Sequence, residues 1–126
     1  MKKIVWCRRD LIRSAYYGLC IDERSFMLEL KRLKVPRKEW PEFVSEGANA
    51  TCHFFENARS RTAIVCLRGH KGRSATEIYG LLIHEAVHIW QDECRAMREK
   101  NPGSEIEAYA IQSVSQNLIE AYQRLA

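Results

Sequence analysis

A long amphipathic stretch over residues 75–100 constrains this chain most, and it has the pentapeptide His84-Glu85-Ala86-Val87-His88 near its middle. Apolar residues recur every three to four positions along it, a period that predicts an α-helix with one buried side. Ser74 and Glu77 have the spacing of a capping box, which predicts the start of the helix. The run Asn101-Pro102-Gly103 predicts its end. The fold must therefore accommodate a long helix with a polar group of side chains at its centre.

A second helix is expected to follow this stop, from Ser104 to the C-terminus. Ser104 and Glu107 have the spacing of a further capping box. Alternatively, Asn101 caps the helix and Pro102 takes its first position. In either arrangement the short connection lets the second helix fold back beside the first.

The N-terminal half predicts helices and one hairpin. Residues 9–20 have helical spacing with Asp10 as a candidate N-cap, and Asp22 is a candidate cap for a helix to about residue 33. Residues 50–56 and 62–67 are rich in strand-forming side chains and are joined by only a few polar residues, which predicts an antiparallel hairpin. The expected class is α+β: a small antiparallel sheet on the two C-terminal helices, with N-terminal helices, in one domain over residues 1–126.

His84 and His88 have the spacing of a metal site. Positions i and i+4 share one face of a helix, so both imidazoles can reach one ion, and zinc is the metal that this pattern favours. Glu85 projects beside them, where it can take a proton from water at the metal. A catalytic zinc has three protein ligands as a rule, so a third is needed. No histidine follows His88, and Asp92 lies too far along the axis. Glu105 and Glu107 remain as candidates.

The chain resembles the gluzincins, metallopeptidases with HExxH on one helix and a glutamate ligand on a later one. The resemblance covers roughly residues 61–112 and implies a zincin-like fold. Many minimal members carry E-x-x-A-(D/N), and Glu105-Ile106-Glu107-Ala108-Tyr109 then places the third zinc ligand at Glu105. A capping role for Glu107 also favours Glu105. Tyr109 departs from the family pattern, which has Asp or Asn there.

The resemblance implies a zinc-dependent metallopeptidase that hydrolyses a protein or peptide substrate with metal-activated water, with Glu85 as the general base. Candidates for a further donor to the oxyanion are Tyr109, Tyr122 and His70, whereas His53 on the hairpin is expected to be structural. In such families the strand before the active-site helix binds the peptide by strand addition, which would be residues 63–67 here. An ordinary strand, paired on both sides, is the alternative.

The charge is divided unevenly between the two parts of the chain. Residues 1–75 carry 16 Lys/Arg and 8 Asp/Glu, a net charge of +8, whereas residues 76–126 carry a net charge of −4. A solvated surface explains most such charge runs. The alternative function is a basic module, associated with nucleic acid or regulation, that keeps a zincin scaffold without general proteolysis. Its basic candidates are Arg8, Arg9, Lys31, Arg32, Lys34, Arg37 and Lys38.

The remaining features concern the compartment. No apolar run approaches the length of a membrane span, and charges at residues 8–10 interrupt any signal-like segment, so a cytoplasmic protein without membrane association is expected. The five cysteines have no C-x-x-C spacing and are expected to be reduced, mostly buried thiols.

Overall fold

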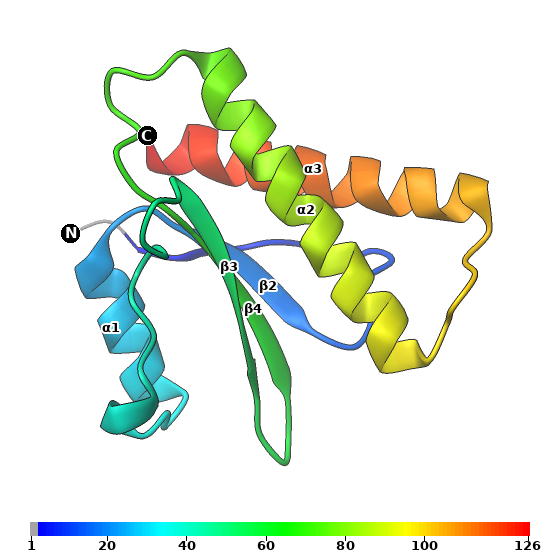
Figure 1. Ribbon diagram of the computed structural model, residues 1–126, viewed down its shortest axis with the longest axis horizontal. Helices are drawn as coiled ribbons and strands as arrows, with labels where there is room; N and C mark the ends of the chain where they lie inside the picture. Colours follow the sequence, from blue (N-terminus) through cyan, green and yellow to red (C-terminus); the bar gives the residue numbers. More distant parts are fainter. Residues whose placement is uncertain (1–2) are drawn as a thin grey trace.

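The computed structural model describes residues 3–126, and residues 1 and 2, which begin the basic N-terminal segment, lie outside the described part. It is an α+β fold, as predicted, in which a four-stranded mixed sheet has α1 on one side and α2 with α3 on the other (Figure 1). The elements in chain order are β1 (Val5–Trp6), β2 (Tyr16–Cys20), α1 (Glu23–Arg32), a 3-10 turn η1 (Arg37–Glu39), β3 (Ala50–Glu56), β4 (Arg61–Leu67), α2 (Ala75–Met97) and α3 (Ser104–Leu125).

Strand β4 occupies the inside of the sheet, whose order is β1-β2-β4-β3. It pairs in parallel with β2 and antiparallel with β3, while β1 pairs antiparallel with β2. Because side chains alternate along a strand, Ala63 and Val65 enter the core under α2 and α3, whereas Ile64 and Cys66 enter the smaller core under α1. Burial on both faces explains why β4 is almost continuously apolar.

The prediction of a helix over residues 9–20 is wrong. Residues 16–20 form β2, and the preceding segment is irregular. Leu11 is 38% exposed, while Tyr17 and Leu19 are fully buried in the sheet. The helical spacing was coincidental, and pairing with β4 decided the conformation. The N-terminal half therefore has one α-helix instead of the two expected, and the sheet is mixed instead of antiparallel.

The other predicted elements are confirmed. Asp22 caps α1 by accepting a hydrogen bond from the Ser25 N–H, and β3 and β4 form the expected antiparallel hairpin. Ser74 and Glu77 form the capping box at the start of α2. That helix ends at Met97, a few residues before the predicted stop at Asn101, and its C-cap residue Arg98 adopts the left-handed conformation with φ of 59°.

Neither predicted cap of the last helix is present. Gly103 is the N-cap residue of α3 and makes no side-chain capping bond, so Ser104 is already helical and Asn101 and Pro102 precede the helix. Glu107 instead accepts a hydrogen bond of 2.9 Å from the indole N–H of Trp90 on α2. A contact between the two helices has thus replaced a local one.

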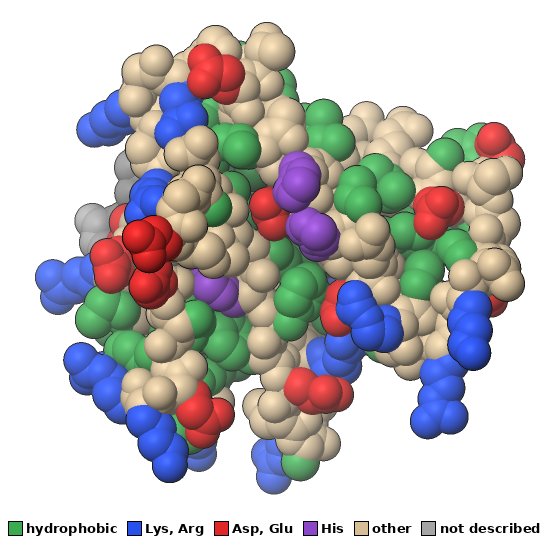
Figure 2. Space-filling model, viewed as in Figure 1, with side chains coloured by type: hydrophobic (Ala, Val, Ile, Leu, Met, Phe, Trp, Pro, Cys, Tyr) green, Lys and Arg blue, Asp and Glu red, His purple; other side chains and the backbone are tan. Residues whose placement is uncertain are grey.

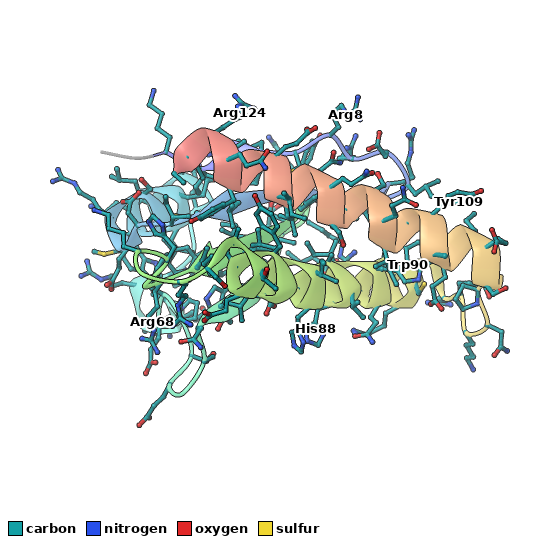
Figure 3. All side chains as sticks on the ribbon, turned by 90° about the horizontal axis from the view of Figure 1, so that it is seen from above. Arg8, Arg68, His88, Trp90, Tyr109 and Arg124 are labelled. Atoms are coloured by element: carbon teal, nitrogen blue, oxygen red, sulfur yellow. The ribbon has the colours of Figure 1, made fainter. Side chains whose placement is uncertain are left out.

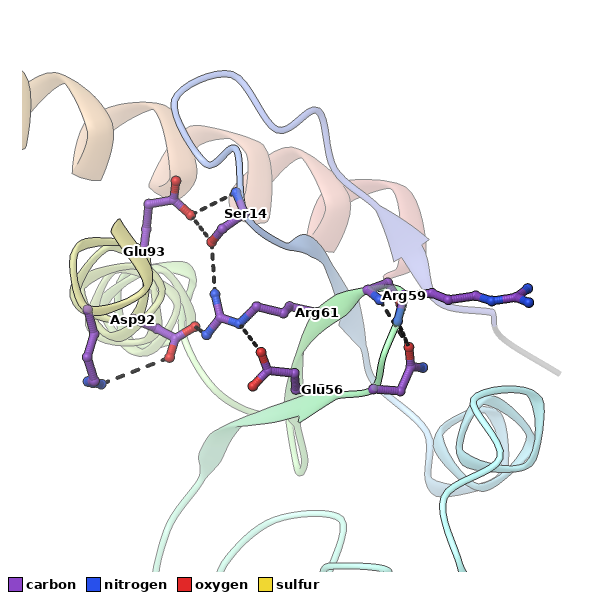
Figure 4. A network of polar contacts seen from close by, with 9 residues as sticks. Ser14, Glu56, Arg59, Arg61, Asp92 and Glu93 are labelled. Atoms are coloured by element: carbon purple, nitrogen blue, oxygen red, sulfur yellow. Dashed lines mark hydrogen bonds and ion pairs between the residues drawn. The ribbon is translucent and has the colours of Figure 1, made fainter. Parts of the chain in front are cut away.

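Two neighbouring carboxylates, Asp92 and Glu93, attach α2 to the rest of the fold (Figure 4). Glu93 is 1% exposed and accepts hydrogen bonds from the backbone N–H groups of Arg13 and Ser14 and from the Ser14 hydroxyl. Asp92 accepts a hydrogen bond of 2.6 Å from Arg61 at the start of β4. Arg61 also donates to the Ser14 hydroxyl at 2.8 Å. These contacts join three parts of the fold at one point: the helix α2, the strand β4, and the loop that precedes β2.

The cysteines lie mostly inside the protein, as predicted. Cys20, Cys66 and Cys94 are buried, and Cys7 and Cys52 are half-buried. Burial raises the pKa of the Cys7 thiol to about 12, so the thiol stays protonated at neutral pH. Among residues 3–126, no helix has both the length and the apolar character needed to cross a membrane.

The attachment of α2 leads to a prediction about stability. Glu93→Ala leaves two backbone N–H groups without their acceptor, so we expect the free energy of unfolding to fall by about 2–3 kcal/mol. Urea denaturation measures this loss. Glu120→Ala, at an exposed position of α3, is the control and should change stability little. Equal effects of the two substitutions would contradict the role assigned to Glu93.

Candidate metal centre

His84 and His88 lie side by side on the exposed side of α2, one helical turn apart. Their Nε2 atoms are 3.2 Å apart, and the ring planes are at 77° to each other. Figure 2 shows two neighbouring histidine side chains at the surface of this face. Two nitrogens bound tetrahedrally to one zinc, at about 2.0–2.1 Å each, lie about 3.3 Å apart. The spacing of these two nitrogens therefore fits two ligand positions of a single zinc ion.

Gln91 orients the His88 ring, a role that the sequence analysis did not predict. Its Oε1 atom lies 3.1 Å from His88 Nδ1. An amide oxygen can only accept, so Nδ1 carries the proton and Nε2 keeps its lone pair on the side of His84. Metal-binding histidines commonly have such a partner on the second nitrogen. The available signal was the i, i+3 spacing of His88 and Gln91 on the predicted helix.

Glu85 lies beneath the histidines and is only 5% exposed. Burial raises the pKa of its carboxyl group, while His84, His88 and a hydrogen bond from the Cys52 backbone N–H act in the opposite direction. The net increase makes Glu85 a stronger base than an exposed glutamate. A base of this kind next to two imidazoles suits proton transfer at the site.

The free edge of the sheet beside this site is β3. The hydrogen bonds Asn57 N–H to Ser60 O and Arg68 N–H to Asn49 O close the hairpin at its two ends, so odd-numbered residues of β3 pair with β4. The N–H and C=O groups of even-numbered residues point outward, away from β4. One of them is the Cys52 N–H, from which Glu85 accepts a hydrogen bond. Residues 63–67 were a candidate edge strand, but β4 is paired on both sides. The alternative prediction, that residues 63–67 form an ordinary strand paired on both sides, is therefore correct. The strand at this edge of the sheet is β3.

A groove of about 550 Å³ adjoins His84 and Glu85. It runs between the N-terminal half of α2 and the loop that leads into β3, and its lining is Gly47, Ala48, Asn49, Ala50, Arg73, Thr76, Glu77, Gly80, Leu81, His84 and Glu85. Another hollow, of about 540 Å³, includes His53 and the loop after α1. His53 there stacks on Phe26 and its Nε2 is 2.9 Å from the Phe43 carbonyl oxygen, contacts that suit the structural role expected of it.

The predicted third ligand does not join the histidines in this structure. Glu105 is exposed in the first turn of α3, and Glu107 is bound to Trp90. Figure 3 shows His88 pointing away from α3, with Trp90 between the two helices. Trp90 follows His88 by two residues, about 200° around the helix, so the contact with α3 is on the other side of α2. Within residues 3–126, no three His, Cys, Asp or Glu side chains are grouped so as to hold a metal.

The candidates for an additional donor also lie outside the groove. Tyr109 is 61% exposed near the start of α3, on the far side of that helix from His88 (Figure 3). His70 and Tyr122 contact each other, with 3.3 Å between Nδ1 and the hydroxyl oxygen. Asp92, excluded as a ligand from its distance along the helix, is paired with Arg61.

Comparison with protein-family models, curated proteins and solved structures finds no match to this chain. The site is therefore interpreted from its own geometry.

Metal titration tests the histidine pair. We expect the protein to bind about one zinc ion per chain, and His84→Ala to weaken binding by at least about 100-fold, beyond the loss typical of an outer-shell change. Isothermal titration with zinc measures both quantities. Glu105→Ala and Glu107→Ala, compared in the same experiment, show which glutamate contributes. Undiminished zinc binding by His84→Ala would exclude the pair as the binding site.

The orientation of His88 gives a separate prediction. Gln91→Ala removes the acceptor at Nδ1, so zinc affinity should fall roughly tenfold while the fold is unchanged. Nitrogen NMR of the histidine rings, recorded without metal, should show a smaller population of the Nδ1-protonated form of His88. Gln112→Ala, at an exposed position of α3, serves as the control. An unaltered His88 tautomer in Gln91→Ala would refute the role given to Gln91.

Proposed function

We propose that this chain is a zinc-dependent metallopeptidase with a zincin-like arrangement of sheet and active-site helix. The observation that supports this most directly is the pair of Nε2 atoms 3.2 Å apart, with the buried carboxylate of Glu85 next to them. Two imidazoles alone would suit many metal sites. The additional carboxylate, which has no place in a purely structural site, favours hydrolysis.

In the proposed reaction His84 and His88 would hold the metal, and Glu85 would transfer the proton. Bound zinc would supply a Lewis acid that polarises the substrate carbonyl and makes water more acidic. Glu85 accepts the proton of the attacking water, because burial has raised the pKa of its carboxyl group. It then delivers that proton to the leaving amine. Gln91 keeps His88 in the form that binds metal.

A peptide is the substrate class that best suits the surroundings. The outward backbone groups of β3 can accept an extended chain by strand addition, independently of its sequence. Glu85 accepts a hydrogen bond from that same edge at Cys52, so a chain bound along β3 passes directly beside the base. The groove next to His84 offers space for a side chain.

Glu105 remains the proposed third ligand, on the strength of the resemblance to gluzincins. The proposal includes a rearrangement at the start of α3, because Glu105 lies apart from the histidines in this structure. Its exposure leaves the side chain accessible for such a change. Zinc titration of Glu105→Ala and of Glu107→Ala tests only the choice of the third ligand. The assignment of the histidine pair does not depend on the result.

The function is tested by Glu85→Gln, which preserves the shape of the side chain and removes the base. We expect zinc binding to persist and the rate of peptide hydrolysis to fall by at least about 100-fold. A proteome digest incubated with each protein and analysed for new termini by mass spectrometry provides the measurement.

Glu120→Gln, at an exposed position of α3, is the control and should cleave like the wild type. The same cleavage products from the wild type and from Glu85→Gln would show that Glu85 is not the base.

A further inference from the structure

Gly80 occupies an unusual position on α2. It is the sixth residue of a helix of 23 residues, past the first turn, where glycine is among the least favourable residues. Glycine in a helix is commonly required by a close neighbour, but a Cβ atom built at Gly80 would meet no atom within 4 Å. Crowding therefore does not explain the absence of a side chain.

The site beside Gly80 offers a different explanation. Gly80 precedes His84 by four residues, so both lie on the same face of α2, and both line the groove of about 550 Å³. Side chains on a helix lean toward its N-terminus, and a larger residue at position 80 would therefore extend over Thr76 and Glu77, which line the same groove. The missing side chain keeps this space open.

The opposite wall of the groove is fixed in place. Arg68 donates to the carbonyl oxygen of Ala48 at 2.9 Å, and Arg73 donates to the side-chain oxygen of Asn49 at 2.7 Å. Arg73 also donates to the Gly69 carbonyl at 2.8 Å and lies 3.9 Å from Glu77 on α2. These bonds hold the loop before β3 against the start of α2, so the groove has a defined width.

The chemistry of the lining indicates which substrate side chain fits. Near His84 the groove is bordered by small or apolar residues, namely Ala48, Ala50, Gly80 and Leu81. Besides Glu85, its charged residues are Glu77, about two turns along the helix from His84, and Arg73, which precedes the helix and lies 3.9 Å from Glu77. Apart from Glu85, which the proposed reaction uses as its base, the part next to the site has no charged side chain with which to bind a charged residue of the peptide.

Building on the proposed function, we propose that Gly80 is a specificity-determining residue and that this groove accepts a bulky apolar side chain of the peptide, adjacent to the bond that is cleaved. An extended chain on the outward edge of β3 carries its side chains alternately to the two faces of the sheet. One of them enters the groove between Ala50 and Gly80. A larger residue at position 80 closes that space without touching His84, Glu85 or His88.

The test compares Gly80→Ala and Gly80→Leu with the wild type on one proteome-derived peptide library, with cleavage sites read by mass spectrometry. Wild-type sites should be enriched in large apolar residues beside the cleaved bond. For those peptides Gly80→Leu should lower kcat/KM by about 10- to 100-fold and shift the preference toward small residues. Zinc content should be unchanged, and the Tm should be equal or higher, because both replacements favour the helix.

Two further measurements separate specificity from general damage. Ala96→Leu adds the same bulk to an exposed position near the other end of α2 and should leave the preference unchanged. Affinity selection of the library on metal-free Glu85→Gln should enrich the same apolar peptides, and on the Glu85→Gln, Gly80→Leu double variant it should not.

The outcomes distinguish the two proposals. If the wild type cleaves no peptide, or Glu85→Gln cleaves as well as the wild type, the proposed function fails and this inference fails with it. If cleavage depends on Glu85 but Gly80→Leu keeps the wild-type preference, the assignment of Gly80 is overturned and the peptidase is not.

Discussion

The position of α2 on the sheet depends on Glu93, a carboxylate buried between the helix and the loop before β2. Its carboxylate oxygens accept hydrogen bonds from two backbone N–H groups and a hydroxyl. These bonds compensate the negative charge, although solvent is excluded. Asp92, the preceding residue, binds Arg61 at the start of β4. Together these residues set where α2 crosses the sheet. Because His84, Glu85 and His88 lie on that helix, their distance from the free edge of β3 follows from the same contacts.

The parts of the fold and of the site that follow from local spacing were predictable from sequence. The helix signals at Ser74 and Glu77 and at Asp22 depend on contacts three residues apart, and they are present in the structure. The convergence of His84 and His88 depends only on helical geometry. In the same way, a short connector was sufficient to identify the β3–β4 hairpin.

The sequence predictions were wrong where contacts between residues far apart in the chain determine the local structure. Residues 16–20 have spacing compatible with a helix, but a parallel partner more than 40 residues later makes them a strand. Glu107 has the local spacing of a capping residue, but its carboxylate accepts a hydrogen bond from the Trp90 indole on another helix. The edge position of β3 and the hydrogen bond from Cys52 to Glu85 likewise depend on strand order, which local patterns do not encode. The third ligand belongs to this class, since it depends on how α3 packs against α2.

The bond between Glu85 and the Cys52 N–H has a consequence for the order of events in the proposed reaction. An added peptide strand would use the same Cys52 N–H group to pair with β3. In the proposed reaction, a peptide would compete with Glu85 for this N–H, and loss of the bond would make the carboxylate more basic when the substrate arrives. When the products depart, Glu85 can return to Cys52. In the proposed reaction, Glu85 would thus be hydrogen-bonded in the resting protein, and binding of the substrate would release it.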